Sequence, residues 1–432
     1  MAILLPLAWT IIFLFIIWRH PFFKIQGIAQ WIILAFFVGK IGVSVVLNYI
    51  YTTYYPDTST SDIHKYFNDA LALFESIHVS VIDYLKILLG IDMNDPRIVE
   101  YLGNTNYWTR QYEYGFFTDN QTIIRVNMLV MLVSGKLLSV HYLFADFVSL
   151  FSFFLIYKAF AKLFKAKYIL LFFIFLMPSS LLWTAGPLKE SIVMLGLGLL
   201  SWGMVNTALN RSWKSIVSVV GGIILLLGIK IYVLVALVPA FVAYFANEKF
   251  PKRQAWFWYA TIYGVGTVII GICDFGLHQI PLFESFASKR SDFINTAIVE
   301  NAGSYIAIGK IEPTVWDFIS ETPRALWNAL ALPYIWSIQS LMHSVSALES
   351  LLFFVLLALM IFFYKQPRNE QKNFIWFCIA FSLVLVWIIG ITTPVVGAIV
   401  RYKMPCFPFL YTTFALLIDW DKIILRFKRK QI

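Results

Sequence analysis

The sequence predicts an all-α, polytopic membrane protein with about eleven to thirteen transmembrane helices. The chain has 432 residues, and only 13% of them are charged, whereas soluble domains are roughly a quarter charged. Its mean hydropathy is +0.75. Aromatic residues make up 18% of the chain, with 15 Trp and 22 Tyr, which is typical of the belts at membrane interfaces. We therefore expect residues 1–432 to form a single integral membrane domain.

Apolar runs long enough to cross a bilayer recur along the whole chain. These runs are residues 2–18, 28–50, 142–164, 168–185, 187–208, 256–274, 349–364, 373–391 and 395–418. The stretch 214–246 is too long for one span, and Gly228 to Lys230 predicts a break into two short helices that form a hairpin. The runs 122–140 and 324–346 are interrupted by charge or by Pro333, so they are re-entrant, interfacial or spanning.

The basic residues set the expected orientation. The net charge is +10, but Lys and Arg form short clusters between apolar runs, so cytoplasmic loops explain them better than nucleic-acid binding does. If 122–140 and 324–346 do not cross, the N-terminus lies outside and the C-terminus inside. Residues 51–122 then form an external loop with juxtamembrane helices, and 275–325 form a second external loop.

The first candidate motif lies in the loop 51–122. Asp62, Tyr66 and Ala70 are spaced four residues apart, so on a helix they share one face. A carboxylate at the start of such a helix can accept a proton from an attacking hydroxyl. Asp57 and Asp69 are rivals for this role, and Ser61 or Asp62 would serve equally well as a helix N-cap.

The second motif, Pro178 to Ser191, joins two apolar runs. Pro187 suits the first position of a helix, and Glu190 suits its first turn. Lys189 is a cation at the positive end of that helix, so it needs an anion, which is either Glu190 or a bound phosphate. Lys230 is expected to join Lys189 around a phosphate or to reach lipid headgroups.

A third motif begins the last apolar run. Arg401 and Lys403, on either side of Tyr402, lie on the outer side against the positive-inside bias, and Pro405 and Pro408 predict a kink. In the loop 275–325, Arg290 contacts an acceptor or is simply solvated. The His and Cys residues show no metal-ligand spacing and no disulfide framework, so we expect no transition metal. The cysteines are Cys273, Cys378 and Cys406.

In these three motifs the chain resembles the bacterial polytopic glycosyltransferases of the GT-C superfamily that act in envelope polysaccharide synthesis. The resemblance implies transfer of a sugar from a polyprenyl-phosphate donor to a glycan, lipid or protein acceptor. The reaction would occur on the outer face of the cytoplasmic membrane, with no cofactor or only a weakly bound divalent cation. Asp62 would be the general base. The residues implied to bind substrate are His64, Tyr66, Lys189, Glu190, Lys230, Arg290, Arg401 and Tyr402.

Two other functions remain open. An O-antigen-type polysaccharide polymerase or ligase would rely on paired arginines, for which Arg290 and Arg324 are available. A flippase or transporter of lipid-linked sugars would show internal repeats and polar residues in mid-span, and neither is evident in the sequence.

Overall fold

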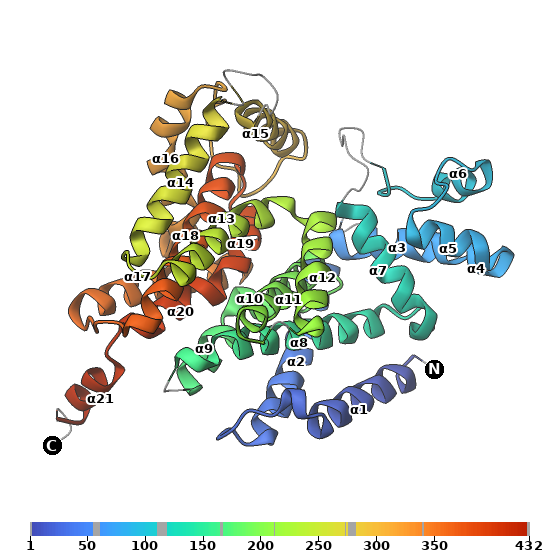
Figure 1. Cartoon of the computed structure of the whole chain (residues 1–432). Helices are drawn as coiled ribbons and strands as arrows, with labels where there is room; N and C mark the ends of the chain where they lie inside the picture. Colours follow the sequence, from blue (N-terminus) through green and yellow to red (C-terminus); the bar gives the residue numbers. More distant parts are fainter. Residues whose placement is uncertain are drawn as a thin grey trace. The chain divides into compact units, whose positions relative to one another are not determined.

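A computed structural model describes residues 2–54, 61–109, 119–164, 167–210, 212–272, 274, 282–338 and 341–429. The described residues form helices joined by turns and loops, and they contain no β-strand (Figure 1). The predicted all-α class is therefore confirmed. The chain divides into two compact units. The first comprises Met1–Ala159 and Leu181–Ile231, and the second comprises Phe160–Ser180 and Tyr232–Ile432.

In the first unit, five helices, α3 to α7, lie in the chain between the two long apolar helices α2 and α8. Helix α3 packs on α7, and α12 packs on both α7 and α11. The helices of this unit are α1 (Leu4–Arg19), α2 (Gln30–Tyr54), α3 (Asp62–Phe74), α4 (Ser76–Val79), α5 (Val81–Leu89), α6 (Pro96–Gly103), α7 (Asp119–Ser134), α8 (Leu138–Phe160), α11 (Lys189–Asn210) and α12 (Trp213–Ile229). The segment 51–122 thus contains the helices expected there, α3 to α6.

The second unit is built around α18, which packs on α14, α15, α16, α19 and α20. The helices of this unit are α9 (Lys167–Phe175), α13 (Ile231–Lys249), α14 (Ala255–Gly271), α15 (Leu282–Val299), α16 (Val315–Ala331), α17 (Leu341–Phe362), α18 (Asn369–Thr392), α19 (Val396–Lys403), α20 (Phe407–Leu417) and α21 (Trp420–Arg429). The boundary between the units runs through α10 (Pro178–Trp183).

Five helices among the described residues are long and apolar enough to cross a membrane. They are Gln30–Thr53, Leu138–Leu163, Ile231–Lys249, His343–Phe362 and Asn369–Thr392. Three shorter apolar helices are α1, α12 and α14. The membrane character predicted from composition is therefore supported, while the count of about eleven spans stays a prediction.

Two apolar runs that were predicted as single spans are broken. Run 168–185 forms α9 and α10, which are separated at Leu176 and Met177, because a residue before a proline disfavours helical geometry and here Pro178 restarts the helix. Run 395–418 forms α19 and α20, with a 3-10 turn at Met404–Cys406 between them. The predicted kink at Pro405 is thus present.

Helices α11 and α12 pack backbone to backbone. A Cβ added at Gly222 would lie 2.8 Å from the carbonyl oxygen of Gly196 and 2.9 Å from the amide nitrogen of Leu200. Ser218 Oγ also donates a hydrogen bond to the Leu199 carbonyl at 2.8 Å. Small residues allow this close approach, as they do in many membrane helix pairs. The pair holds the start of α11 and the end of α12 in fixed register.

Candidate functional site

The candidate site begins at the first turn of α3. Ser61 is the N-cap residue: its Oγ accepts a hydrogen bond from the His64 backbone N–H at 3.4 Å and lies 2.6 Å from His64 Nδ1. Asp62 is in the first turn and is partly exposed. A carboxylate there interacts favourably with the helix dipole. Ser61 therefore provides the cap of this helix.

His64 is partly exposed on the same turn. Burial lowers the pKa of its imidazole below the ordinary value of 6.5, since desolvation disfavours the charged form. Burial therefore favours the neutral form of this imidazole.

Tyr66 connects α3 to the start of α11. Its side chain is buried, and Lys189 Nζ lies 5.1 Å from the centre of its ring. An ammonium over an aromatic face is attracted by the ring quadrupole. The structure thus brings Lys189, from the second sequence motif, against the motif that contains Asp62.

Lys189 is paired with the first turn of α7. Its Nζ lies 2.5 Å from Asp119 Oδ2 and donates a hydrogen bond to Asn120 Oδ1 at 2.7 Å. Lys189 is 4% exposed, whereas the Asp119 side chain is 28% exposed. The cation predicted to need an anion therefore has one within the protein, and that anion is Asp119 rather than the neighbouring Glu190.

Glu190 pairs with Lys230 instead. The distance from Lys230 Nζ to Glu190 Oε1 is 2.9 Å, and both side chains are buried. Lys230 is the non-helical residue that caps the C-terminus of α12. The negative end of the helix dipole stabilises a cation at that position. The expectation that its ammonium reaches lipid headgroups was wrong.

The start of α11 also differs from the prediction. The helix begins at Lys189, two residues after Pro187, while Glu190 lies in the first turn as expected. The preceding turn packs tightly: a Cβ added at Gly186 would lie 3.1 Å from Ile63 Cδ1, beside Asp62. The contact of Gly186 with Ile63 therefore holds the motif of Pro178 to Ser191 close to the motif that contains Asp62.

The rival carboxylates have different positions. Asp57 lies outside the described residues. Asp69 accepts hydrogen bonds from the backbone N–H groups of Asn106 at 3.0 Å and Tyr107 at 2.8 Å. Burial raises its pKa, and these hydrogen bonds oppose that rise. Asp69 thus holds a loop, and Asp62 remains the partly exposed carboxylate of α3.

A buried charged pair joins two of the predicted spans, and the sequence motifs did not predict it. Lys40 Nζ of α2 lies 3.7 Å from Asp146 Oδ1 of α8, and both side chains are buried. The signal was available, because a single lysine in one apolar run and a single aspartate in another are expensive in a membrane unless they are paired. The statement that mid-span polar residues are absent was therefore wrong.

This pair supports the turn that precedes Lys189. Lys40 Nζ donates hydrogen bonds to Thr184 Oγ1 at 2.8 Å and to the Leu181 carbonyl at 3.3 Å. Ser44 Oγ donates to Asp146 Oδ2 at 2.6 Å and also contacts the Ala185 carbonyl. Backbone carbonyls released by a helix break need such partners in a membrane, so Lys40 and Ser44 stabilise the break.

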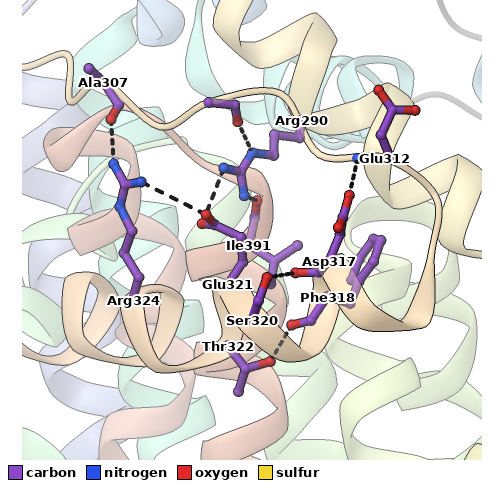
Figure 2. Close-up of polar contacts among 11 residues, drawn as sticks. Arg290, Ala307, Glu312, Asp317, Phe318, Ser320, Glu321, Thr322, Arg324 and Ile391 are labelled. Carbon is purple, nitrogen blue, oxygen red and sulfur yellow. Dashed lines mark hydrogen bonds and ion pairs between the residues drawn. The ribbon is translucent and has the colours of Figure 1, made fainter.

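The predicted residues of the second unit lie apart from this network in the sequence and are described separately. Figure 2 shows Arg290 and Arg324 converging on Glu321. The Arg290 guanidinium lies 3.4 Å from Glu321 Oε2 and donates hydrogen bonds to the carbonyls of Gly309 and Ile391. Arg290 is 1% exposed, so it is not a solvated residue. It connects α15 to α16 through Glu321 and to α18 through the Ile391 carbonyl.

Arg324 has a different environment. Its side chain is 49% exposed and lies 3.9 Å from Glu321 Oε1. Burial lowers the pKa of Arg290, and Glu321 opposes that effect. Two arginines thus share one carboxylate, which leaves this cluster with a positive charge on its exposed side.

Arg401 and Tyr402 lie at the end of α19 and are partly exposed. The ring of Tyr402 lies 6.4 Å from that of Tyr232 and 6.5 Å from that of Phe293. Lys403, in contrast, is buried and donates hydrogen bonds to the carbonyls of Ala329 and Leu332.

Cys378 and Cys406 are buried and unpaired, as their apolar context predicted, whereas Cys273 is not among the described residues. A search of the described residues finds no group of three His, Cys, Asp or Glu side chains that could hold a metal ion. Comparison with known proteins returns no matching family model, no matching curated protein and no matching solved structure.

Proposed function

We propose that this chain is a membrane glycosyltransferase that moves a sugar from a polyprenyl-phosphate donor to a glycan, lipid or protein acceptor. One observation carries the proposal: the turn of α3 that bears Asp62 is held against the ammonium of Lys189 through the ring of Tyr66, at 5.1 Å. A carboxylate on α3 and a cation at the start of the neighbouring α11 provide a base for the acceptor and a partner for the leaving phosphate.

Asp62 accepts the proton of the acceptor hydroxyl in the reaction that we propose. The hydroxyl oxygen forms a bond to the anomeric carbon, and the bond from that carbon to the phosphate oxygen breaks. The electron pair leaves with the phosphate, whose charge the Lys189 ammonium stabilises. Attack opposite the leaving group inverts the anomeric centre.

The other residues of the first unit have supporting roles. His64 positions the sugar beside Asp62, and the buried Tyr66 holds Lys189 through its ring. The buried pair of Glu190 with Lys230, at 2.9 Å, fixes the start of α11 and therefore Lys189. The roles of Arg290, Arg401 and Tyr402 in substrate binding stay predictions.

The proposed site lies on the outer face of the membrane. With about eleven spans and the basic loops inside, segment 51–122 and the α10–α11 turn face the outside of a bacterial cytoplasmic membrane. A polyprenyl-phosphate sugar would approach from the outer leaflet.

The variant Asp62→Asn tests the proposal. Loss of a general base lowers the rate by about 100- to 10,000-fold, while the donor still binds. Transfer is measured with radiolabelled polyprenyl-phosphate sugar on purified protein in lipid discs, and donor retention is measured by filtration. The matched control is Asp92→Asn, because Asp92 is an exposed acid of the same segment. Its backbone φ is +51°, and asparagine also adopts such positive φ values. Full activity of Asp62→Asn would rule out the proposed mechanism.

One observation favours a second candidate, the polysaccharide polymerase or ligase. Arg290 and Arg324 both contact Glu321. A polymerase or ligase of this class would need two neighbouring arginines of this kind. Arg324→Gln discriminates between the two candidates in the same assay format. A ligase loses activity with this change and tolerates Asp62→Asn, whereas the proposed transferase shows the reverse.

A further inference from the structure

A polar pocket opens beside the second turn of α3. It has a volume of about 310 Å³ and is lined by Lys65, Asn68, Asp69, Asn106 and Tyr107. The volume lies at the lower end of the roughly 300–1,000 Å³ found for small-molecule sites. None of the roles proposed above uses this pocket.

The pocket is built by Asp69. This carboxylate is 2% exposed and fixes the loop after α6 through the N–H groups of Asn106 and Tyr107. Lys65 Nζ lies 4.7 Å from the centre of the Tyr107 ring, which orients that ring. The walls are therefore held in place before any ligand binds, which lowers the entropic cost of binding.

The accessible groups define the class of ligand. Asn68 and Asn106 are exposed and offer amide donors and acceptors, and the ring of Tyr107, which Lys65 Nζ faces, forms part of the wall. Lys65 is the one cationic group among the described lining residues, and it already lies over an aromatic ring. A multiply charged phosphate would find one positive charge here, whereas a polyhydroxylated ring would find several neutral partners.

The pocket is connected to the candidate site. Asn120 donates a hydrogen bond to the Tyr107 carbonyl at 3.0 Å and accepts one from Lys189 at 2.7 Å. Asp69 follows Asp62 by seven residues, which corresponds to about 10 Å along the same face of α3. A chain of sugars whose terminal hydroxyl lies at Asp62 would extend along α3 to the pocket.

We propose that the pocket of Lys65, Asn68, Asp69, Asn106 and Tyr107 binds an internal sugar ring of a glycan acceptor. The assignment of this sugar to the acceptor rests on the proposed transferase function. Binding of a sugar in the pocket does not rest on it, because the pocket is defined by its own residues.

Saturation-transfer NMR tests this proposal on the full chain in lipid discs. The probes are the methyl glycosides of glucose, galactose, mannose and N-acetylglucosamine at millimolar concentration. Asn68→Trp fills the pocket and removes the signal of the bound sugar, and Asn68→Ala with Asn106→Ala weakens it several-fold without adding bulk. Asn104→Ala is the matched control, because Asn104 is exposed on the same loop and does not line the pocket.

The result separates the two proposals. Retained sugar binding in Asp62→Asn, lost in Asn68→Trp, supports the pocket whether or not Asp62 proves to be the base. Absence of a signal for all four probes with the unaltered chain overturns the pocket proposal, and so does an equal signal in Asn68→Trp. Neither of those results bears on transfer by Asp62.

Discussion

Lys189 and Glu190 are adjacent in the chain, yet each is neutralised by a different helix. Lys189 meets Asp119 of α7, and Glu190 meets Lys230 at the end of α12. Consecutive residues of a helix point about 100° apart, so they face different neighbours. Lys189 therefore lies against Tyr66 of α3. Glu190 is fully buried beside Lys230.

The Glu190–Lys230 pair gives a prediction at this scale. Lys230→Met leaves the fully buried Glu190 carboxylate without its ammonium, which costs about 3–5 kcal/mol when a buried pair is broken. The double variant Lys230→Met with Glu190→Gln removes both charges, so it recovers part of that loss. Thermal unfolding in lipid discs provides the measurement.

The order of the melting temperatures decides the outcome. We expect the unaltered chain to be highest, the double variant next and Lys230→Met lowest. A melting temperature of Lys230→Met equal to that of the unaltered chain would show that the pair contributes no stability.

At the scale of elements, the close contact of α11 and α12 fixes where Lys189, Glu190 and Lys230 lie. The contact depends on glycine at a few positions where the two backbones touch. A neighbouring glycine that faces open space does not contribute in this way. Gly221 and Gly222 illustrate the difference, because a Cβ at Gly221 would find its nearest atom at 4.0 Å.

This contrast gives a prediction with an internal control. Gly222→Ala places a methyl group 2.8 Å from the Gly196 carbonyl oxygen, so the helices must separate and the melting temperature falls. Gly221→Ala meets no such contact and gains helix propensity of about 1 kcal/mol, so its melting temperature is unchanged or higher. Equal effects of both substitutions would contradict the close-packing account.

The break between α10 and α11 is a second feature at this scale. The turn exposes carbonyls that Lys40 and Ser44 satisfy from α2, and Asp146 balances the charge from α8. A turn within apolar surroundings is stable only with such partners. The buried pair of Lys40 and Asp146 therefore stabilises the turn that precedes Lys189.

At the scale of the whole molecule, the proposed orientation can be tested through single cysteines. After replacement of Cys273, Cys378 and Cys406 by serine, Asn104→Cys lies in segment 51–122 and Asn369→Cys at the start of α18, and both positions are exposed. A membrane-impermeant maleimide on intact cells is expected to label Asn104→Cys and to leave Asn369→Cys unlabelled until the cells are lysed.

The reverse labelling pattern would place segment 51–122 in the cytoplasm. The donor would then have to be used on the inner face, and the proposed location of the site would be wrong. Labelling of both cysteines in intact cells would show that the basic loop before α18 lies outside, which contradicts the positive-inside assignment.

Much of the fold was predictable from the sequence because it depends on local chemistry. The apolar runs predicted α2, α8, α14 and α18, and the glycine and lysine near position 230 predicted the break after α12. Pro405 and Pro408 predicted the break before α20, whereas the break before α10 was not predicted. Ser61 was recognisable as an N-cap, and the structure gives it that role.

The partners of the charged residues were decided by the tertiary structure. The sequence indicated that Lys189 needs an anion, but Asp119 lies 70 positions away and was found only when α7 packed beside α11. Lys40 and Asp146 likewise meet because α2 packs against α8. The sequence determined an apolar, helical chain with charges that must be compensated, because hydropathy and turn chemistry act over a few residues. The folded structure selected which charges compensate each other, because electrostatic pairing depends on distances in space.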